Sequence, residues 1–167
     1  MNLRFALALM IFGLAAQSAA AAGLPSRAPG LWQSTTTVTG PDGKPLANAV
    51  NVVTVSCVDA LTDQKFFISG GSACDSLNIS GDGNTFKIDG TCRQQGRAVK
   101  IRETLVYADA KDVQLKAHMG SGARAMTVTS QLQWQGECLD GMQPGDEGNI
   151  VNGTFTKADN INDNANQ

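Results

Sequence analysis

The stretch that decides the fold is residues 99–134, VKIRETLVYADAKDVQLKAHMGSGARAMTVTSQLQW. Apolar and polar side chains alternate along it with a period of two, which is typical of strands that bury one face. A glycine-containing turn at 120–123 interrupts the pattern and sets Met119 opposite Met126. The stretch therefore predicts antiparallel strands that share one apolar face, formed by Val99, Ile101, Leu105, Tyr107, Val113, Leu115, Ala117, Met119, Met126, Val128, Leu132 and Trp134.

The same apolar face continues upstream through residues 77–92. Asp82-Gly83 has the composition of a two-residue hairpin loop, where both positions favour a positive φ. In that register Ile79 lies opposite Phe86, and a slip of one residue would break the apolar face. Further strand candidates, rich in threonine and valine as β-propensity favours, are 31–39 and 50–58.

Residues 59–68 are the exception to the strand pattern, because Asp59 can cap a short helix with a partial apolar face. Residues 149–156 form a weak final strand candidate. Seven antiparallel strands in a meander predict an all-β fold, a small barrel or a strongly curved sandwich. Closure into a barrel would remove the exposed edges of the sheet.

The chain begins with an export signal. Arg4 precedes an apolar run over 5–16 and a small-residue site that ends at Ala22, which together predict a secretory signal peptide over 1–22, cleaved after Ala22. The apolar run is shorter than the roughly 20 residues of a membrane span, so no membrane anchor is expected. We predict a periplasmic protein with one all-β domain over 23–157 and a disordered, Asn/Asp-rich tail over 158–167.

Composition and motifs exclude several classes of function. The formal net charge is −2 and aromatic residues make up 5% of the chain, so neither a basic patch nor stacking platforms for nucleic acid are expected. The single histidine, His118, alternates in step with the solvent-facing residues Gln114 and Lys116. It also lacks the oriented partner that a catalytic base needs. No phosphate-binding, dinucleotide-binding or nucleophile motif occurs in its required context. We therefore expect no catalytic residue, metal or cofactor, and a protein that is not an enzyme.

Cys57, Cys74, Cys92 and Cys138 are the only cysteines, and all lie downstream of the export signal. They lack the close pairs of zinc sites, and in an oxidising compartment they predict two disulfides with three possible pairings. Strand direction places Cys74 and Cys92 at one end of the central hairpin. If the first strand runs antiparallel to the last, Cys57 reaches Cys138 at the other end. We therefore predict Cys74–Cys92 and Cys57–Cys138, although the ideal register requires a bulge or a loop position for Cys74.

Glu103 interrupts the apolar face between Ile101 and Leu105. The predicted registers place it beside Ile88 and Ala117, and the small alanine leaves room for a longer side chain. One interpretation is a carboxylate inside a cavity that orients a ligand. The other is an edge position or an ion pair, because a buried unpaired carboxylate is costly; the possible partners are Arg97, Arg124 and Lys116.

Five inward residues are candidates for contact with a ligand. Met119 and Met126 would provide an adaptable lining, and Glu103 would provide a polar group. Trp32 and Trp134 could line the same pocket, although such residues more often pack in a core or at a barrel end. The corresponding hypothesis is a non-enzymatic binding module for a small apolar or amphipathic ligand.

Short motifs in a particular order resemble domain-of-unknown-function family 3617. They are Pro29-Gly30-Leu31-Trp32 before a Thr-rich strand, Val55-Ser56-Cys57-Val58, an isolated Cys74, Gly90-Thr91-Cys92, and Trp134-Gln135-Gly136-Glu137-Cys138. The resemblance covers about residues 28–138. It implies a small uncharacterised protein exported by a Gram-negative bacterium, and it transfers no catalytic residue.

A second function remains open beside ligand binding. With a packed core and a Thr/Gln-rich outer face, the domain would instead be a protein-interaction or envelope-stress factor, with an envelope protein as partner. The sequence leaves the ligand, the partner and the oligomeric state undetermined.

Overall fold

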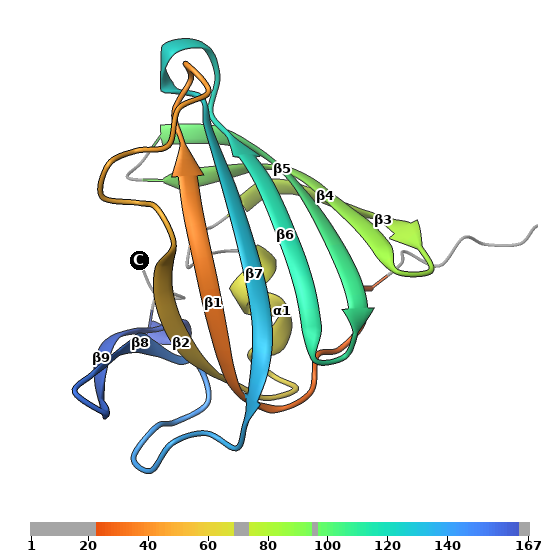
Figure 1. The fold of residues 1–167 in the computed structure, drawn as a ribbon. Helices are drawn as coiled ribbons and strands as arrows, with labels where there is room; N and C mark the ends of the chain where they lie inside the picture. The colour runs from red at the N-terminus through yellow and green to blue at the C-terminus, as the bar shows by residue number, and fades with distance from the viewer. Residues whose placement is uncertain (1–22, 69–73, 95–96, 164–167) are drawn as a thin grey trace, which may run out of the picture.

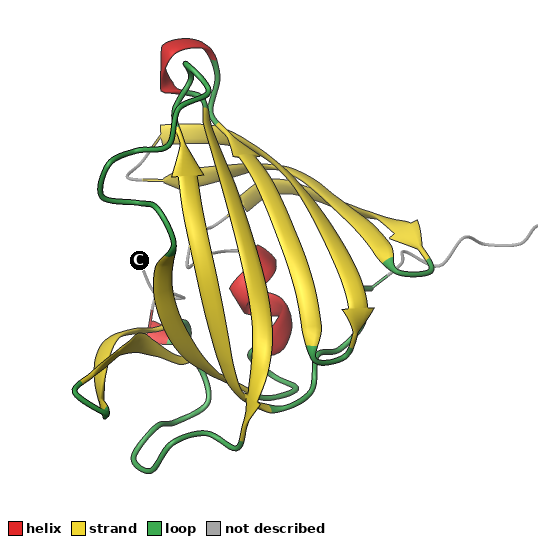
Figure 2. Ribbon diagram, in the orientation of Figure 1, coloured by secondary structure: helices red, strands yellow, loops and turns green. Residues whose placement is uncertain are grey.

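The computed structural model describes residues 23–68, 74–94 and 97–163. The predicted signal peptide therefore lies outside the described residues. The chain forms one antiparallel sheet of nine strands, β3-β4-β5-β6-β7-β1-β2-β8-β9, and a short helix, as Figures 1 and 2 show. The elements are β1 (Gly30–Thr39), β2 (Val52–Val58), α1 (Asp63–Ile68), β3 (Cys74–Asp82), β4 (Thr85–Gln94), β5 (Arg97–Asp109), β6 (Asp112–Met119), the 3-10 helix η1 (Gly122–Arg124), β7 (Met126–Gly136), β8 (Asp146–Val151) and β9 (Thr154–Asn160).

The expected all-β class is confirmed, but closure into a barrel is not found. β1 pairs antiparallel with β7, as the predicted cysteine geometry required. The free edge of β2 then pairs with β8 at Val55 and Ser56 instead of meeting β3. Because β8 and β9 extend the sheet on this side, β3 and β9 are its two edge strands and the sheet stays open.

The sheet curves around α1, which lies on its concave side (Figure 1). Asp59 caps the turn before α1, because its Oδ1 accepts hydrogen bonds from the backbone N–H of Leu61 at 3.0 Å and of Thr62 at 2.8 Å. Phe67 of α1 is buried in the hydrophobic core. The other members of this core are Leu24, Trp32, Val58, Phe86, Ile88, Leu105, Tyr107, Val113 and Leu132.

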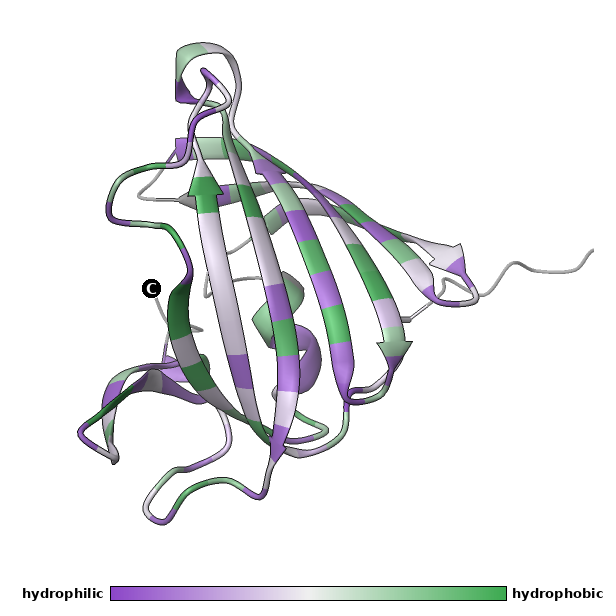
Figure 3. Cartoon of the chain, in the orientation of Figure 1, coloured by the Kyte–Doolittle hydropathy of each residue, from purple (hydrophilic) through white to green (hydrophobic). Residues whose placement is uncertain are grey.

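The period-two pattern is confirmed in the strands of the sheet centre. Met119 pairs with Met126 across β6 and β7, as expected. The hydropathy colours in Figure 3 alternate along β6, whose inward Val113 and Ala117 are buried while outward Gln114 and Lys116 are exposed. The inner face is therefore concave and largely apolar, and the outer face is convex and polar.

The predicted register of the hairpin between β3 and β4 is wrong, because the two-residue loop lies one residue further along the chain than expected. Asp82 pairs with Thr85, so the two-residue loop is Gly83-Asn84, and Ile79 faces Ile88 rather than Phe86. Gly81 makes this possible, since it has φ 138° and a Cβ there would overlap the Thr85 carbonyl oxygen. Side-chain faces are unchanged, because moving the loop by one residue changes the opposing partner by two.

The C-terminal region contains more structure than the single weak strand that was expected. Residues 146–160 form a hairpin of two strands, and Ile161 beyond it is buried. Asp146 anchors this hairpin, because its Oδ1 accepts from Lys157 Nζ at 2.6 Å and from Asn160 Nδ2 at 2.7 Å. Burial disfavours the carboxylate, but these bonds outweigh it and lower the pKa of Asp146. The predicted tail boundary at 158 therefore falls inside β9, and residues 164–167 lie outside the described part.

The two disulfides are Cys57–Cys138 and Cys74–Cys92, the pairs expected from strand direction. Cys74 pairs directly with Cys92 across β3 and β4, and the register shifts between Cys74 and Ser76. This shift is the bulge that the pairing required, since it turns Cys74 to the same face as Cys92. The other disulfide ties β2 to the segment that follows β7.

Candidate functional site

The inward side chains of the concave face are most deeply buried in its lower part, next to α1 and the turn between β5 and β6. Trp32, Leu105 and Val113 are fully or almost fully buried there. Towards the loop between β6 and β7, by contrast, the inward side chains are half-buried. We call this region the upper inner face; it consists of Val38, Ile101, Glu103, Met119, Met126 and Val128.

Strand pairing brings these residues together from four neighbouring strands. Glu103 lies opposite Ala117, Ala117 opposite Val128, and Val128 opposite Val38. Met119 lies in the next row, between Ile101 and Met126. Glu103, Met119 and Met126 are thus neighbours, as the sequence predicted.

Glu103 is the anomalous polar group of this face. It lies on the central strand β5, opposite Ile88 and Ala117, and its Oε2 is buried without a hydrogen-bond partner among the described residues. Within these residues it forms no ion pair with Arg97, Arg124 or Lys116, so neither the edge position nor an ion pair accounts for it. Loss of water around the carboxylate raises the pKa of Glu103 to about 7.

Another polar pair on the same face is satisfied. The Thr36 and Ser130 hydroxyls, on neighbouring strands, share a hydrogen bond of 2.8 Å. Hydroxyl and carboxyl groups that leave water normally gain such a partner, but among the described residues the Oε2 of Glu103 has none. A ligand group that donates a hydrogen bond could supply what the described residues do not.

The raised pKa has a consequence for stability. The native state holds the Glu103 proton more tightly than the unfolded chain, so stability is highest below the unfolded pKa of about 4.5 and falls as pH rises through about 7. The contribution lost is on the order of 3 kcal/mol. We expect Glu103→Gln to flatten this dependence and to be more stable than wild type at about pH 8. Urea denaturation below about pH 4.5 and at about pH 8 tests this, and Glu137→Gln, at an exposed position, is the control. If the free energy of unfolding changed equally with pH in wild type and in both variants, the expectation would be contradicted.

Trp32 lies at the other end of the inner side from the upper inner face. It is completely buried in the lower core, where its Nε1 donates to the Ala28 carbonyl at 2.8 Å. The reason is its position at the start of β1, which carries it to the end of the sheet that α1 covers. Trp32 is therefore a core residue, the packing role that such residues more often have.

Trp134 likewise lies apart from Glu103 and the two methionines. It pairs with Trp32 across β7 and β1 at the lower end, and its Nε1 donates to the Pro29 carbonyl at 2.9 Å. The Lys111 ammonium lies 4.1 Å from the centre of its ring. Both tryptophans thus hold the segment before β1 through hydrogen bonds to the carbonyls of Ala28 and Pro29.

Sequence reasoning missed a buried ion pair beneath α1. Arg27 Nε donates to Asp63 Oδ1 at 2.6 Å, and the Arg27 backbone N–H donates to Asp63 Oδ2 at 2.9 Å. The guanidinium also lies 4.8 Å from the ring centre of Trp32 and 4.3 Å from that of Phe67. Burial lowers the pKa of Arg27, and the charge of Asp63 opposes that shift. The pair joins the segment before β1 to the start of α1.

The hydroxyl of Tyr107 is buried near this pair and has no hydrogen-bond partner among the described residues. Burial, together with the charge of Asp63, raises the pKa of Tyr107 to about 12. Its ring packs edge-on against Phe86, with centroids 5.9 Å apart. Because α1 covers the lower core, we regard this cluster as part of the support for α1 and not as a reaction centre.

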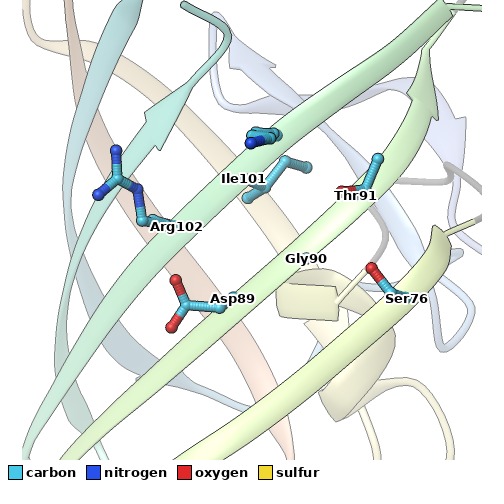
Figure 4. Close-up of a pocket in the computed structure, with 7 residues that line it drawn as sticks. Ser76, Asp89, Gly90, Thr91, Ile101 and Arg102 are labelled. Carbon is cyan, nitrogen blue, oxygen red and sulfur yellow. The ribbon is translucent and has the colours of Figure 1, made fainter.

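The opposite, convex face carries a shallow open depression of about 500 Å³ over β3, β4 and β5 (Figure 4). Its lining is mostly polar and charged: Ser76, Asp89, Gly90, Thr91, Lys100, Ile101 and Arg102. In the part of the chain that the structure describes, no group of three or more histidine, cysteine or acidic residues is placed to hold a metal ion. Over the same residues, no helix has the length and apolar character to cross a membrane.

The fold and the site together define a disulfide-linked, all-β domain with an open, curved sheet and a carboxyl group on its apolar inner face. A family model described as "Protein of unknown function (DUF3617)" matches residues 27–138. The chain belongs to this family, and the match ends at Cys138, before β8. Comparisons with curated proteins and with solved structures gave no match.

Proposed function

We propose that this protein is a non-enzymatic binding module of the periplasm that holds a small apolar or amphipathic ligand against its upper inner face. The observation that carries the proposal is the buried, unpartnered Oε2 of Glu103 among half-buried apolar side chains. A bound ligand would cover those side chains and donate a hydrogen bond to the carboxyl group.

The chemistry of the site restricts the ligand. Met119 and Met126 are unbranched and polarizable, so they can adapt to apolar groups of different shape. Near neutral pH Glu103 exists in both protonation states, because its pKa is about 7. It can therefore accept a hydrogen bond from an amine or hydroxyl group when ionised. An amphipathic molecule with one such group and an apolar body fits these requirements.

The filled lower part of the concave side favours the second candidate, a protein-interaction factor without a ligand. Trp32, Leu105 and Val113 are completely buried there. A direct binding experiment separates the two candidates, because only the binding module requires the upper inner face to accept a small molecule.

Phenylnaphthylamine is a suitable probe, since it is an apolar amine whose fluorescence rises when it leaves water. We expect the wild-type protein to bind it, and Met119→Glu to weaken binding at least about tenfold, because the ligand would have to desolvate the new carboxylate. Val53→Glu is the matched control; Val53 lies on the opposite side of the sheet and is 48% exposed. Its effect should be small.

The polar contact is tested in the same assay. Wild-type affinity should change between about pH 6 and about pH 8 as Glu103 ionises, whereas Glu103→Leu should bind with a flat pH profile. Native mass spectrometry of protein released gently from the periplasm would complement the assay. The proposal is wrong if the probe does not bind and no small molecule accompanies the purified protein.

A further inference from the structure

The convex face of the sheet carries a cluster of cations, although the chain as a whole is acidic. Lys87 on β4, Lys100 and Arg102 on β5 and Lys116 on β6 all occupy outward positions in the strand pairing. All four side chains are exposed. Asp89 lies opposite Arg102 among them, and Asp109 and Asp112 lie on the same side at the ends of β5 and β6. We call these four residues the outer basic face.

These four cations are not engaged elsewhere in the described chain. The ion pairs found there use Arg27, Arg93 and Lys157 instead. Even the Asp89 carboxylate is not within ion-pair distance of Arg102. Figure 4 shows the two side chains pointing away from each other. The outer basic face therefore keeps its charge available for an external anion.

Acidic residues gather at the other end of the sheet. From residue 137 to residue 163 the chain has six acidic residues, Glu137, Asp140, Asp146, Glu147, Asp159 and Asp163, against the single cation Lys157. β8 and β9 lie at the opposite end of the strand order from β4 and β5. The charge is therefore more negative around β8 and β9 than over β4, β5 and β6, which would favour approach of the β4–β6 side to a negative surface.

We propose that the outer basic face docks the protein on an anionic lipid membrane, with the depression beside Lys100 accepting a lipid phosphate. The Thr91 and Ser76 hydroxyls line the depression next to Lys100 and Arg102, so hydrogen-bond donors accompany the positive charges. Thr91 pairs directly with both Lys100 and Ser76 across the strands.

The composition of this face selects a membrane over a protein partner. Protein interfaces usually contain a buried core enriched in aromatic residues. The outward positions of β4, β5 and β6 contain no aromatic residue and consist mainly of charged, threonine and glutamine side chains. A diffuse electrostatic contact with lipid head groups needs no apolar core. The upper inner face lies on the other side of the same strands, so docking would leave it accessible.

Vesicle co-sedimentation of the mature protein at low ionic strength tests the proposal. We expect binding to vesicles that contain phosphatidylglycerol and none to pure phosphatidylcholine. Lys100→Gln/Arg102→Gln should weaken partitioning about 25-fold, since each cation near an anionic surface contributes about fivefold, or ~1 kcal/mol. Raising the salt to about 0.15 M should weaken wild-type binding too, because the Debye length falls to about 8 Å.

Lys44→Gln is the matched control, because Lys44 is an exposed lysine outside the sheet and its loss changes the net charge in the same way as the loss of Lys116. It should change partitioning less than about twofold, whereas Lys116→Gln should change it about fivefold. Equal effects of the two variants, or no binding of wild type to the anionic vesicles, would overturn the proposal. Binding to immobilised polyglutamate without binding to vesicles would also overturn it and would assign the face to an acidic protein.

Discussion

Replacing Cys57 and Cys138 together by alanine is expected to lower the free energy of unfolding by about 4.5 kcal/mol. The two cysteines are 81 residues apart, so reduction releases a long loop in the unfolded chain. Typical domains are stable by about 5–15 kcal/mol, so this change would remove much of the stability. Guanidinium denaturation of the double variant measures the loss.

The second disulfide provides the comparison. Cys74 and Cys92 are 18 residues apart, so their replacement by alanine should cost less, about 3 kcal/mol. The longer bridge also ties β2 to the segment that follows β7, while the shorter one closes a single hairpin. A larger loss from Cys74 and Cys92 than from Cys57 and Cys138 would show that loop length does not govern these contributions.

Asp63→Ala is expected to destabilise the protein by about 3–5 kcal/mol, because it leaves the Arg27 guanidinium buried without its counter-ion. Both side chains are almost inaccessible, with 1% and 4% of their surface exposed. Arg27→Met/Asp63→Leu should recover most of the loss, since it removes both charges and keeps the core filled. Urea denaturation of the single and double variants measures the coupling between the two residues.

The exposed ion pair between Arg93 and Asp75 is the control for this experiment. Its side chains are 58% and 50% exposed, so Arg93→Ala should change stability by less than about 1 kcal/mol. The cycle uses Arg27→Met and Asp63→Leu as the single variants. If their effects simply add in the double variant, the ion pair is not coupled and α1 is held by apolar packing alone.

Glu103 shows how much of the candidate site could be predicted from local sequence pattern. Its parity placed it on the apolar face, and hairpin registers placed it beside Ile88 and Ala117, as the structure has it. Those inferences needed only neighbours along short hairpins. Whether a cation lies close enough to pair with the Glu103 carboxylate depends on how several separate strands and loops pack together. Side-chain alternation along one strand cannot predict that.

Trp32 and Trp134 show where such reasoning stopped. Side-chain alternation correctly placed Trp134 on the inner side, but alternation does not say how far along a strand a residue lies from a helix that covers the sheet. Because α1 covers the lower end, Trp32 is buried in the hydrophobic core and Trp134 packs against the segment around Pro29. The Arg27–Asp63 pair was missed for the same reason, since its members are 36 residues apart and belong to no periodic pattern.

The sequence by itself determined the all-β class, the faces of the central strands, the short capped helix and the direction of the strands that carry the four cysteines. These features follow from side-chain alternation and turn chemistry, which act between near neighbours. Only the tertiary structure decided that the sheet stays open, that α1 fills its lower concave side and that Glu103 keeps an unpartnered oxygen. Strand edges, helix docking and the pairing of buried charges depend on contacts between distant segments, and no local pattern specifies those.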